Sequence, residues 1–176
     1  MSQSQGQTTE QLHKALLKLA AQLDVKVTLT AAGDGWWERV VRWRRSSRPN
    51  ELGSYQLLPS LSGWKVRIQV RDSLSADERC RILVHELAHA LLHGNPIAGC
   101  NSIRTRELEA GLCELITLAE VGVCSTETVA YLHHWSKSGC YQLSDERTAY
   151  VQQVARRLSE GVNNCWHPAS RHLSSD

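Results

Sequence analysis

The sequence predicts an α+β domain in which helices cover one face of a small antiparallel sheet. Two observations support this fold class. One helical pattern and about three strand patterns occupy the first 70 residues, and the apolar residues after residue 75 follow the period of helices. The chain has 176 residues, close to the length of one domain, so we expect residues 1–176 to form a single domain.

The composition is that of an ordinary folded protein. Hydrophobic residues make up 41% and charged residues 22% of the chain, which excludes a mainly disordered protein. Twenty basic and eighteen acidic residues give a net charge of +2, too even to predict nucleic-acid or membrane binding from charge alone. No segment reaches the ~20 apolar residues of a membrane span, and the polar start lacks the features of a secretory signal. We therefore expect a cytoplasmic protein with no membrane contact.

Six cysteines are spread along the chain without a Cys-x-x-Cys pair, so their spacing favours neither a zinc cluster nor a redox motif. We expect reduced thiols that behave as small apolar residues. The alternative is an exported protein that contains disulfides and has lost its signal. The positions are Cys80, Cys100, Cys113, Cys124, Cys140 and Cys165.

The first helix is expected to begin at Thr8, after a Ser/Gln-rich tail at residues 1–7. Thr8 and Gln11 have the spacing of a capping box, and leucines recur on one face of the helix. A strand follows, because apolar and polar residues alternate from Val25 to Thr30. The leucines of the helix are Leu12, Leu16, Leu19 and Leu23.

A hairpin is expected next. The segment Tyr55–Leu58 leads into a turn that contains Pro59 and Gly63. The returning strand, Trp64–Val70, has the clearest apolar–polar alternation in the chain.

Four helices are expected after the hairpin. The first begins with a capping box of Ser75 and Glu78 and ends at Gly94. The other three are expected at residues 105–121, 126–137 and 144–160. Gly161 is expected to end the last helix, which leaves 162–176 as a loose tail.

The first of these four helices contains His85-Glu86-Leu87-Ala88-His89, an HExxH motif. Residues four apart lie on one face of a helix with Cβ atoms ~6 Å apart, so His85 and His89 can bind one metal ion. Glu86 lies ~100° around the helix, where it can reach a water beside that ion and act as the general base. This pattern is typical of a zinc peptidase, and Zn²⁺ is the expected ion. The alternative is a structural helix with two surface histidines.

Catalytic zinc usually has three protein ligands, so a third ligand must come from elsewhere in the chain. The next helix offers Glu107 and Glu109. They begin a stretch from Glu107 to Glu127 that has five glutamates and no Lys or Arg. Because the connecting loop can vary in length, spacing alone does not choose between them. A solvated acidic face is the simpler interpretation for Glu120 and Glu127.

The segment from His85 to His93, followed by Arg106-Glu-Leu-Glu-Ala-Gly111, resembles the ImmA/IrrE family of metallopeptidases and the related ArdC-type antirestriction proteins. In those families a glutamate of an E-x-x-A pattern on the helix after HExxH is the third zinc ligand. Glu107-Leu-Glu-Ala110 matches this pattern. The resemblance therefore implies a zincin-like fold with a gluzincin-type site formed by His85, His89 and Glu107.

The resemblance covers about residues 53–161 and includes a Gly-x-Tyr strand with Gly53 and Tyr55. The chain departs from the family at Glu114, where alanine is common, and in residues 36–48, which have no counterpart. The resemblance implies a cytoplasmic endopeptidase whose substrate is a separate protein, typically a helix-turn-helix repressor linked to mobile genetic elements or stress responses. The strand Trp64–Val70 is a candidate edge to which an extended substrate could add.

Other histidines have weaker interpretations. His93 lies one turn beyond His89, so it could be a fourth nearby nitrogen; the simpler interpretation is a helix-end cap or a group that contacts a metal ligand rather than the metal. His133 or His134 is a candidate oxyanion donor, with a packed or solvated histidine as the simpler interpretation. His13, His167 and His172 carry no signal.

Residues 36–48 contain three tryptophans, five arginines and one acid. Arginines pair with phosphates and tryptophans stack on bases, so one alternative function is an ArdC-like, DNA-associated antirestriction protein. The simpler interpretation of the segment is an amphipathic strand or loop with core tryptophans and solvated arginines. A third possibility is a metal-binding scaffold without catalysis, which the presence of Glu86 disfavours.

Overall fold

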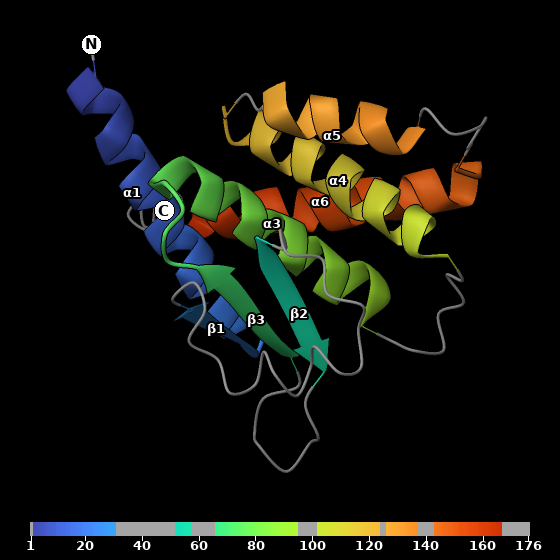
Figure 1. Ribbon diagram of the computed structural model, residues 1–176, viewed down its shortest axis with the longest axis horizontal. Helices are drawn as coiled ribbons and strands as arrows, with labels where there is room; N and C mark the ends of the chain where they lie inside the picture. Colours follow the sequence, from blue (N-terminus) through green and yellow to red (C-terminus); the bar gives the residue numbers. More distant parts are fainter. Residues whose placement is uncertain are drawn as a thin grey trace, which may run out of the picture.

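The computed structural model describes residues 2–30, 52–57, 66–94, 102–123, 126–136 and 143–166 (Figure 1). Its helices are α1 (Ser2–Gln22), α3 (Ala76–His93), α4 (Ile103–Glu120), α5 (Thr126–Ser136) and α6 (Asp145–Trp166), and its strands are β1 (Val25–Thr30), β2 (Gly53–Leu57) and β3 (Val66–Arg71). The fold is mixed α+β and mostly helical, which confirms the predicted class. The segment 36–48 and the turn around Pro59 and Gly63 lie outside the described residues.

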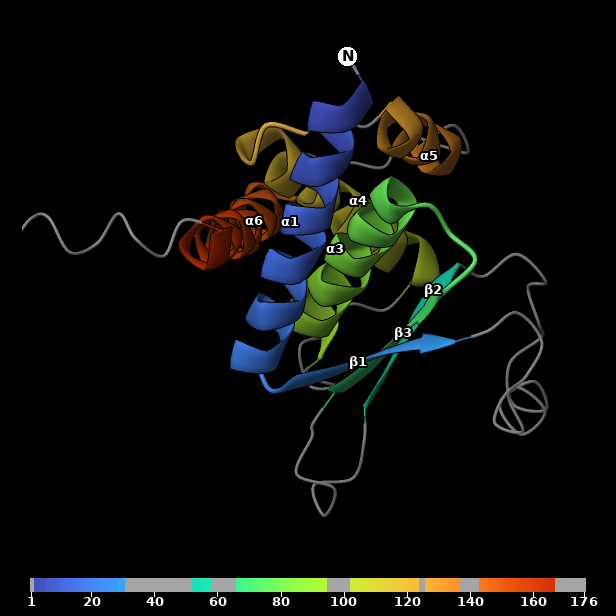
Figure 2. The ribbon, with the colours of Figure 1, turned by 90° about the vertical axis from the view of Figure 1, so that its left-hand side faces the viewer.

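Helix α3 is the centre of the fold, because α1, α4, α6, β2 and β3 all pack against it. Figure 2 shows the helices together on one face of the sheet, with α3 next to the strands. The helix begins with the predicted capping box: Ser75 Oγ accepts the Glu78 N–H at 3.3 Å, and the Glu78 carboxylate accepts the Ser75 N–H at 2.9 Å. Leu83 and Leu87 are buried on its core side.

The sheet has the strand order β1-β3-β2, which corrects two predictions. Strand β2 pairs antiparallel with β3, as expected for the hairpin, but β1 pairs parallel with β3, so the sheet is mixed rather than antiparallel. Strand β3 is therefore central, and the expected edge at Trp64–Val70 is wrong. Residue alternation indicates a strand and its buried face but not the direction of its neighbours. The deep burial of Ile68 and Val70 is typical of a central strand.

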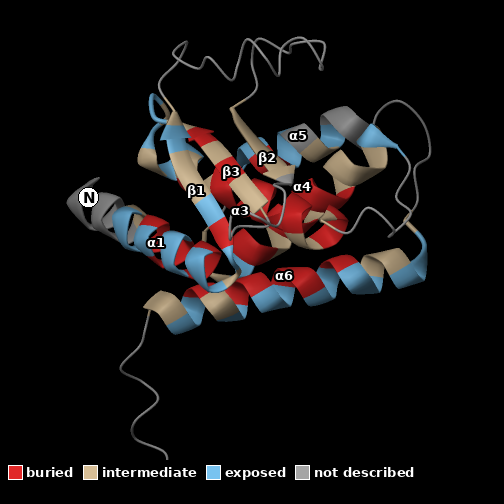
Figure 3. Cartoon of the chain, turned by 90° about the horizontal axis from the view of Figure 1, so that it is seen from below, coloured by how far each residue is buried: buried red, intermediate tan, exposed pale blue. Residues whose placement is uncertain are grey.

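Both terminal helices are longer than predicted. Helix α1 begins at Ser2, so Thr8 is not its cap, and residues 2–7 are helical. Helix α6 continues through Gly161 to Trp166. A Cβ atom at position 161 would lie 2.5 Å from Leu19 Cδ1, so glycine lets α1 and α6 approach closely instead of ending the helix. Figure 3 shows the buried stripe of α6 that faces the core.

Helix α4 ends as predicted near Gly122, which has a positive φ of 79°. The Val123 N–H donates to the Leu118 carbonyl at 2.8 Å and the Gly122 N–H to the Ala119 carbonyl at 3.1 Å, the pattern of a Schellman motif. Among the described cysteines, Cys80, Cys113 and Cys165 are free thiols. Burial raises the pKa of Cys80 and of Cys113 to about 12. None of the helices in the described ranges is long and apolar enough to span a membrane.

Candidate metal centre

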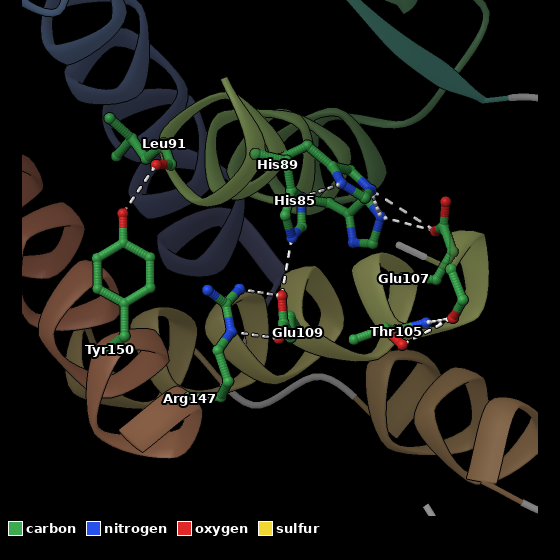
Figure 4. Close-up of polar contacts among 10 residues, drawn as sticks. His85, His89, Leu91, Thr105, Glu107, Glu109, Arg147 and Tyr150 are labelled. Carbon is green, nitrogen blue, oxygen red and sulfur yellow. Dashed lines mark hydrogen bonds and ion pairs between the residues drawn. The ribbon is translucent and has the colours of Figure 1, made fainter. Parts of the chain in front are cut away.

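Three side chains from two helices converge between α3 and α4. His85 and His89 lie one turn apart on α3, and their Nε2 atoms are 3.1 Å apart. Glu107, in the second turn of α4, places its Oε2 atom 3.4 Å from His85 Nε2 and 3.6 Å from His89 Nε2. Figure 4 shows both imidazole rings directed towards Glu107. These three residues form a group that could hold a metal ion.

The spacing of the three atoms fits a tetrahedral ion. Zinc bonds of ~2.0–2.1 Å at tetrahedral angles place neighbouring ligand atoms about 3.4 Å apart. The observed separations of 3.1, 3.4 and 3.6 Å lie close to that value. Two imidazoles and one carboxylate are also a ligand set of catalytic zinc sites, in which the fourth position is left for water or substrate.

The start of helix α4 determines where Glu107 lies along the helix. Ser102 caps the helix, and its Oγ accepts the Thr105 N–H at 3.0 Å. Glu107 therefore falls in the second turn, where α4 packs against α3. Its side chain is 23% exposed, more than either histidine side chain, so the centre is most open on the Glu107 side.

Strand β2 covers the same part of α3. The Tyr55 ring stacks on the His89 ring, with centroids 5.4 Å apart and planes at 14°. A Cβ atom at Gly53 would lie 2.4 Å from Ile82 Cγ2 and 3.1 Å from Glu86 Oε1. Only glycine allows β2 to come this close to α3. Glu86 is buried next to β2, beside the two histidines.

His85 is held from behind by a buried carboxylate. Its Nδ1 atom lies 2.9 Å from Glu114 Oε2. The other oxygen of Glu114 accepts a hydrogen bond from Thr128 Oγ1 on α5 and lies 3.6 Å from the Arg81 guanidinium. Such a carboxylate–histidine pair fixes the proton on Nδ1 and leaves Nε2 as the metal-binding atom.

His89 is held from behind by a second histidine. Its Nδ1 atom lies 3.2 Å from His93 Nδ1, and His93 Nε2 lies 2.9 Å from Glu109 Oε2. Arg147 on α6 donates to both oxygens of Glu109, at 2.8 Å from Nε and 2.5 Å from Nη2 (Figure 4). Glu109 is fully buried, and its pairing with His93 and Arg147 holds its pKa below the usual value although burial alone would raise it.

The two α3 histidines have opposite pKa shifts. Burial would lower the pKa of His85, but its hydrogen bonds to Glu107 and Glu114 raise it to about 10. Burial lowers the pKa of His89 to about 4; the hydrogen bond with Glu107 opposes this shift, and the charge of His85 adds to it. In the metal-free centre, Glu107 and Glu114 thus favour positive charge on His85.

Carboxylates lie on several sides of the centre. Among the described residues there are four, and two arginines pair with two of them. Their negative charge would favour a bound cation. The carboxylates are those of Glu86, Glu107, Glu109 and Glu114, and the arginines are Arg81 and Arg147.

The structure brings together His85, His89 and Glu107, the set that the family resemblance implies, and Glu86 is buried next to His85 in the same helix. The structure distinguishes Glu107 from Glu109, because the Glu109 carboxylate is engaged by His93 and Arg147 instead. Both ring nitrogens of His93 have partners, so His93 lies behind His89 rather than among the converging atoms.

None of the other predicted residues is among the described residues that converge at the centre. His133 is exposed on α5. The side chain of His134, and residues His167 and His172, lie outside the described part of the chain. Glu120 and Glu127 are exposed, as their simpler interpretation predicts.

Sequence reasoning missed Glu114, Thr128 and Arg147 as parts of the centre. Glu114 follows Glu107 by seven residues, two helical turns, so both lie on the same face of α4. That spacing could have identified Glu114. No local signal identifies Arg147, which reaches Glu109 from 38 residues further along the chain.

Comparison with known protein families finds no match for this chain. An uncharacterized protein of Bacillus anthracis is 32% identical over 83 residues, which cover 47% of this chain and 14% of the relative's length. No solved structure matches the chain. Fold and centre together define an α+β protein with a site that could hold a divalent metal ion. Its resemblance to the ImmA/IrrE family stays a prediction from the motifs.

Proposed function

We propose that this chain is a zinc-dependent endopeptidase. The observation that carries the proposal is the convergence of His85 Nε2, His89 Nε2 and Glu107 Oε2 at 3.1 to 3.6 Å from one another. Zinc, when bound, supplies Lewis-acid polarisation of a carbonyl and lowers the pKa of the attacking water. His85, His89 and Glu107 would hold the ion.

Glu86 is the proposed general base. It follows His85 in the helix and is buried beside β2. The rotation of ~100° per residue places its side chain to one side of the proposed ligand atoms. Its carboxylate would accept the proton of the water that attacks the scissile carbonyl, and then deliver that proton to the leaving amine. A buried carboxylate in this place supports catalysis over a purely structural metal site.

Strand β2 is the proposed docking edge for the substrate, in place of the Trp64–Val70 strand. Among the described strands, β2 is at one end of the sheet, and it passes directly over His89 and Glu86. An extended peptide that hydrogen-bonds to an exposed strand edge is held by its main chain, which accommodates many sequences. A separate protein substrate, such as a cytoplasmic helix-turn-helix repressor, follows from the family resemblance alone.

The test compares the wild-type protein with Glu86→Gln, and uses Glu127→Gln on the exposed surface of α5 as a matched control. Zinc-loaded proteins are incubated with a peptide mixture from a digested proteome and with any repressor encoded beside the gene, and new termini are read by mass spectrometry. We expect all three to hold one zinc ion and only Glu86→Gln to lose cleavage. Zinc-loaded wild type without cleavage, or Glu86→Gln with full activity, would contradict the proposal.

The alternative of a DNA-associated protein depends on residues 36–48, which lie outside the described part of the chain. It predicts DNA binding that weakens steeply with salt and is lost in a variant with Arg42, Arg44 and Arg45 changed to alanine.

A further inference from the structure

We propose that His93, Glu109 and Arg147 are positioning residues that keep the proton of His89 on Nδ1 and so leave Nε2 free to bind the metal. This inference rests on the proposed metal centre. It assigns a role to a chain of polar contacts that runs from α6 through α4 to α3 and ends at one of the converging nitrogen atoms.

The chain of contacts starts with an ion pair of defined geometry. Arg147 approaches Glu109 side-on and donates to both carboxylate oxygens, at 2.8 and 2.5 Å. The Glu109 side chain is fully buried, so no solvent competes for these oxygens. Two donated hydrogen bonds from a guanidinium favour the ionised carboxylate, which can only accept hydrogen bonds.

The next link follows from the donor rules of imidazole. His93 Nε2, 2.9 Å from Glu109 Oε2, must carry a hydrogen, because the carboxylate has none to give. Since Arg147 already balances the charge of Glu109, a neutral His93 ring completes this buried network without excess charge, and its lone pair is then on Nδ1. That atom faces His89 Nδ1 at 3.2 Å, so the hydrogen between the two rings belongs to His89.

The last link fixes the metal-binding atom. With its hydrogen on Nδ1, His89 has a lone pair on Nε2, the atom that faces His85 and Glu107. The opposite tautomer would place a hydrogen in the centre and weaken metal binding. The His93 side chain is only 2% exposed, so no bulk water can replace its contact. Arg147 thereby makes the C-terminal helix part of the metal centre.

The first test reads the tautomer directly. Histidine labelled with ¹⁵N in the metal-free wild-type protein distinguishes a protonated from an unprotonated ring nitrogen by NMR at neutral pH. We expect hydrogen on His89 Nδ1 and on His93 Nε2. Hydrogen on His89 Nε2 would overturn the inference. This measurement does not depend on metal binding or on any variant folding correctly.

The second test measures zinc affinity by competition with a chelator for two His93 variants. In His93→Leu the acceptor is removed, and we expect affinity to fall about tenfold, at the lower end of the effect of outer contacts on metal sites. In His93→Asn an amide oxygen can take the place of Nδ1, and we expect most of the affinity to return. His133→Asn on the exposed face of α5 is the control and should bind zinc as the wild type does.

Two results would contradict the role of His93 while leaving the metal centre intact: wild-type affinity in His93→Leu, or the same loss in both His93 variants, which would indicate packing alone. Wild-type protein that binds no zinc would instead contradict the proposed function. The NMR result would still decide the tautomer in that case.

Discussion

His85 and His89 lie one turn apart on α3, yet they are supported from behind in different ways. A carboxylate, Glu114, lies directly against His85 Nδ1. His89 reaches its carboxylate, Glu109, only through the ring of His93. We refer to these as the Glu114 support and the Glu109 support.

The two supports also differ in how their carboxylates are neutralised. Glu109 receives two short hydrogen bonds from Arg147. Glu114 has one longer contact of 3.6 Å with Arg81 and one hydrogen bond from Thr128. A carboxylate with a weaker cationic partner interacts more strongly with the adjacent histidine. The Glu114 support should therefore contribute more to metal affinity, and the Glu109 support more to the stability of the fold.

The largest expected effect comes from Glu114→Ala. This change removes the group that orients His85, and we expect zinc affinity to fall about 100-fold, at the upper end for an outer contact. Chelator competition measures the affinity, and circular dichroism checks that the variant is folded. A loss smaller than that of His93→Leu would reverse the proposed ranking of the two supports.

The next largest effect is a difference in stability between variants of the two arginines. Arg147→Met leaves a fully buried carboxylate without its ion pair, a type of change that costs ~3–5 kcal/mol when both partners are buried. Because the Arg147 side chain is 29% exposed, we expect a smaller loss of about 2 kcal/mol. Arg81→Met is the matched control. The Arg81 side chain is 18% exposed, but its single contact with Glu114 is longer, 3.6 Å, so we expect a smaller loss of about 1 kcal/mol. Urea unfolding of the metal-free variants compares them, and equal losses would refute the distinction.

A smaller effect on affinity is expected for Glu109→Ala. His93 loses its acceptor but still faces His89, so zinc affinity should fall by less than about tenfold. The variant should still hold one zinc ion at saturating zinc. Complete loss of zinc would mean that Glu109, rather than Glu107, is the third ligand.

The smallest expected effect is that of Thr128→Val. The substitution keeps the shape of the buried side chain and removes one hydrogen bond to Glu114, which should cost about 1 kcal/mol of stability. Zinc affinity should change no more than about twofold, because the contact between Glu114 and His85 remains. Urea unfolding and chelator competition on the same protein give both values, and an affinity loss above tenfold would show that Thr128 orients Glu114.

Much of this centre follows from short-range sequence patterns. The capping box at Ser75 predicts the start of one helix, and the spacing of His85 and His89 predicts two candidate ligands on it, because a helix places residues four apart on one face. Only the family resemblance indicates Glu107, because the loop between the two helices does not determine which glutamate of α4 faces the histidines. The contact between Arg147 and Glu109 was not predictable, because it depends on how α6 packs against α4.

The errors in the fold have similar causes. Gly161 is typical of a helix end, but its close approach to Leu19 is a tertiary contact that no local pattern reveals. The alternation in β3 indicates a half-buried strand and says nothing of its two neighbours, so it does not distinguish a central strand from an edge strand.

The central claim is that His85, His89 and Glu107 hold one zinc ion. The most direct test is the metal content of the purified protein, with wild type beside Glu107→Ala and Glu109→Ala. We predict one zinc ion per chain in wild type and in Glu109→Ala at saturating zinc, and none in Glu107→Ala. Wild-type protein that binds no divalent metal after incubation with zinc at neutral pH would contradict the claim.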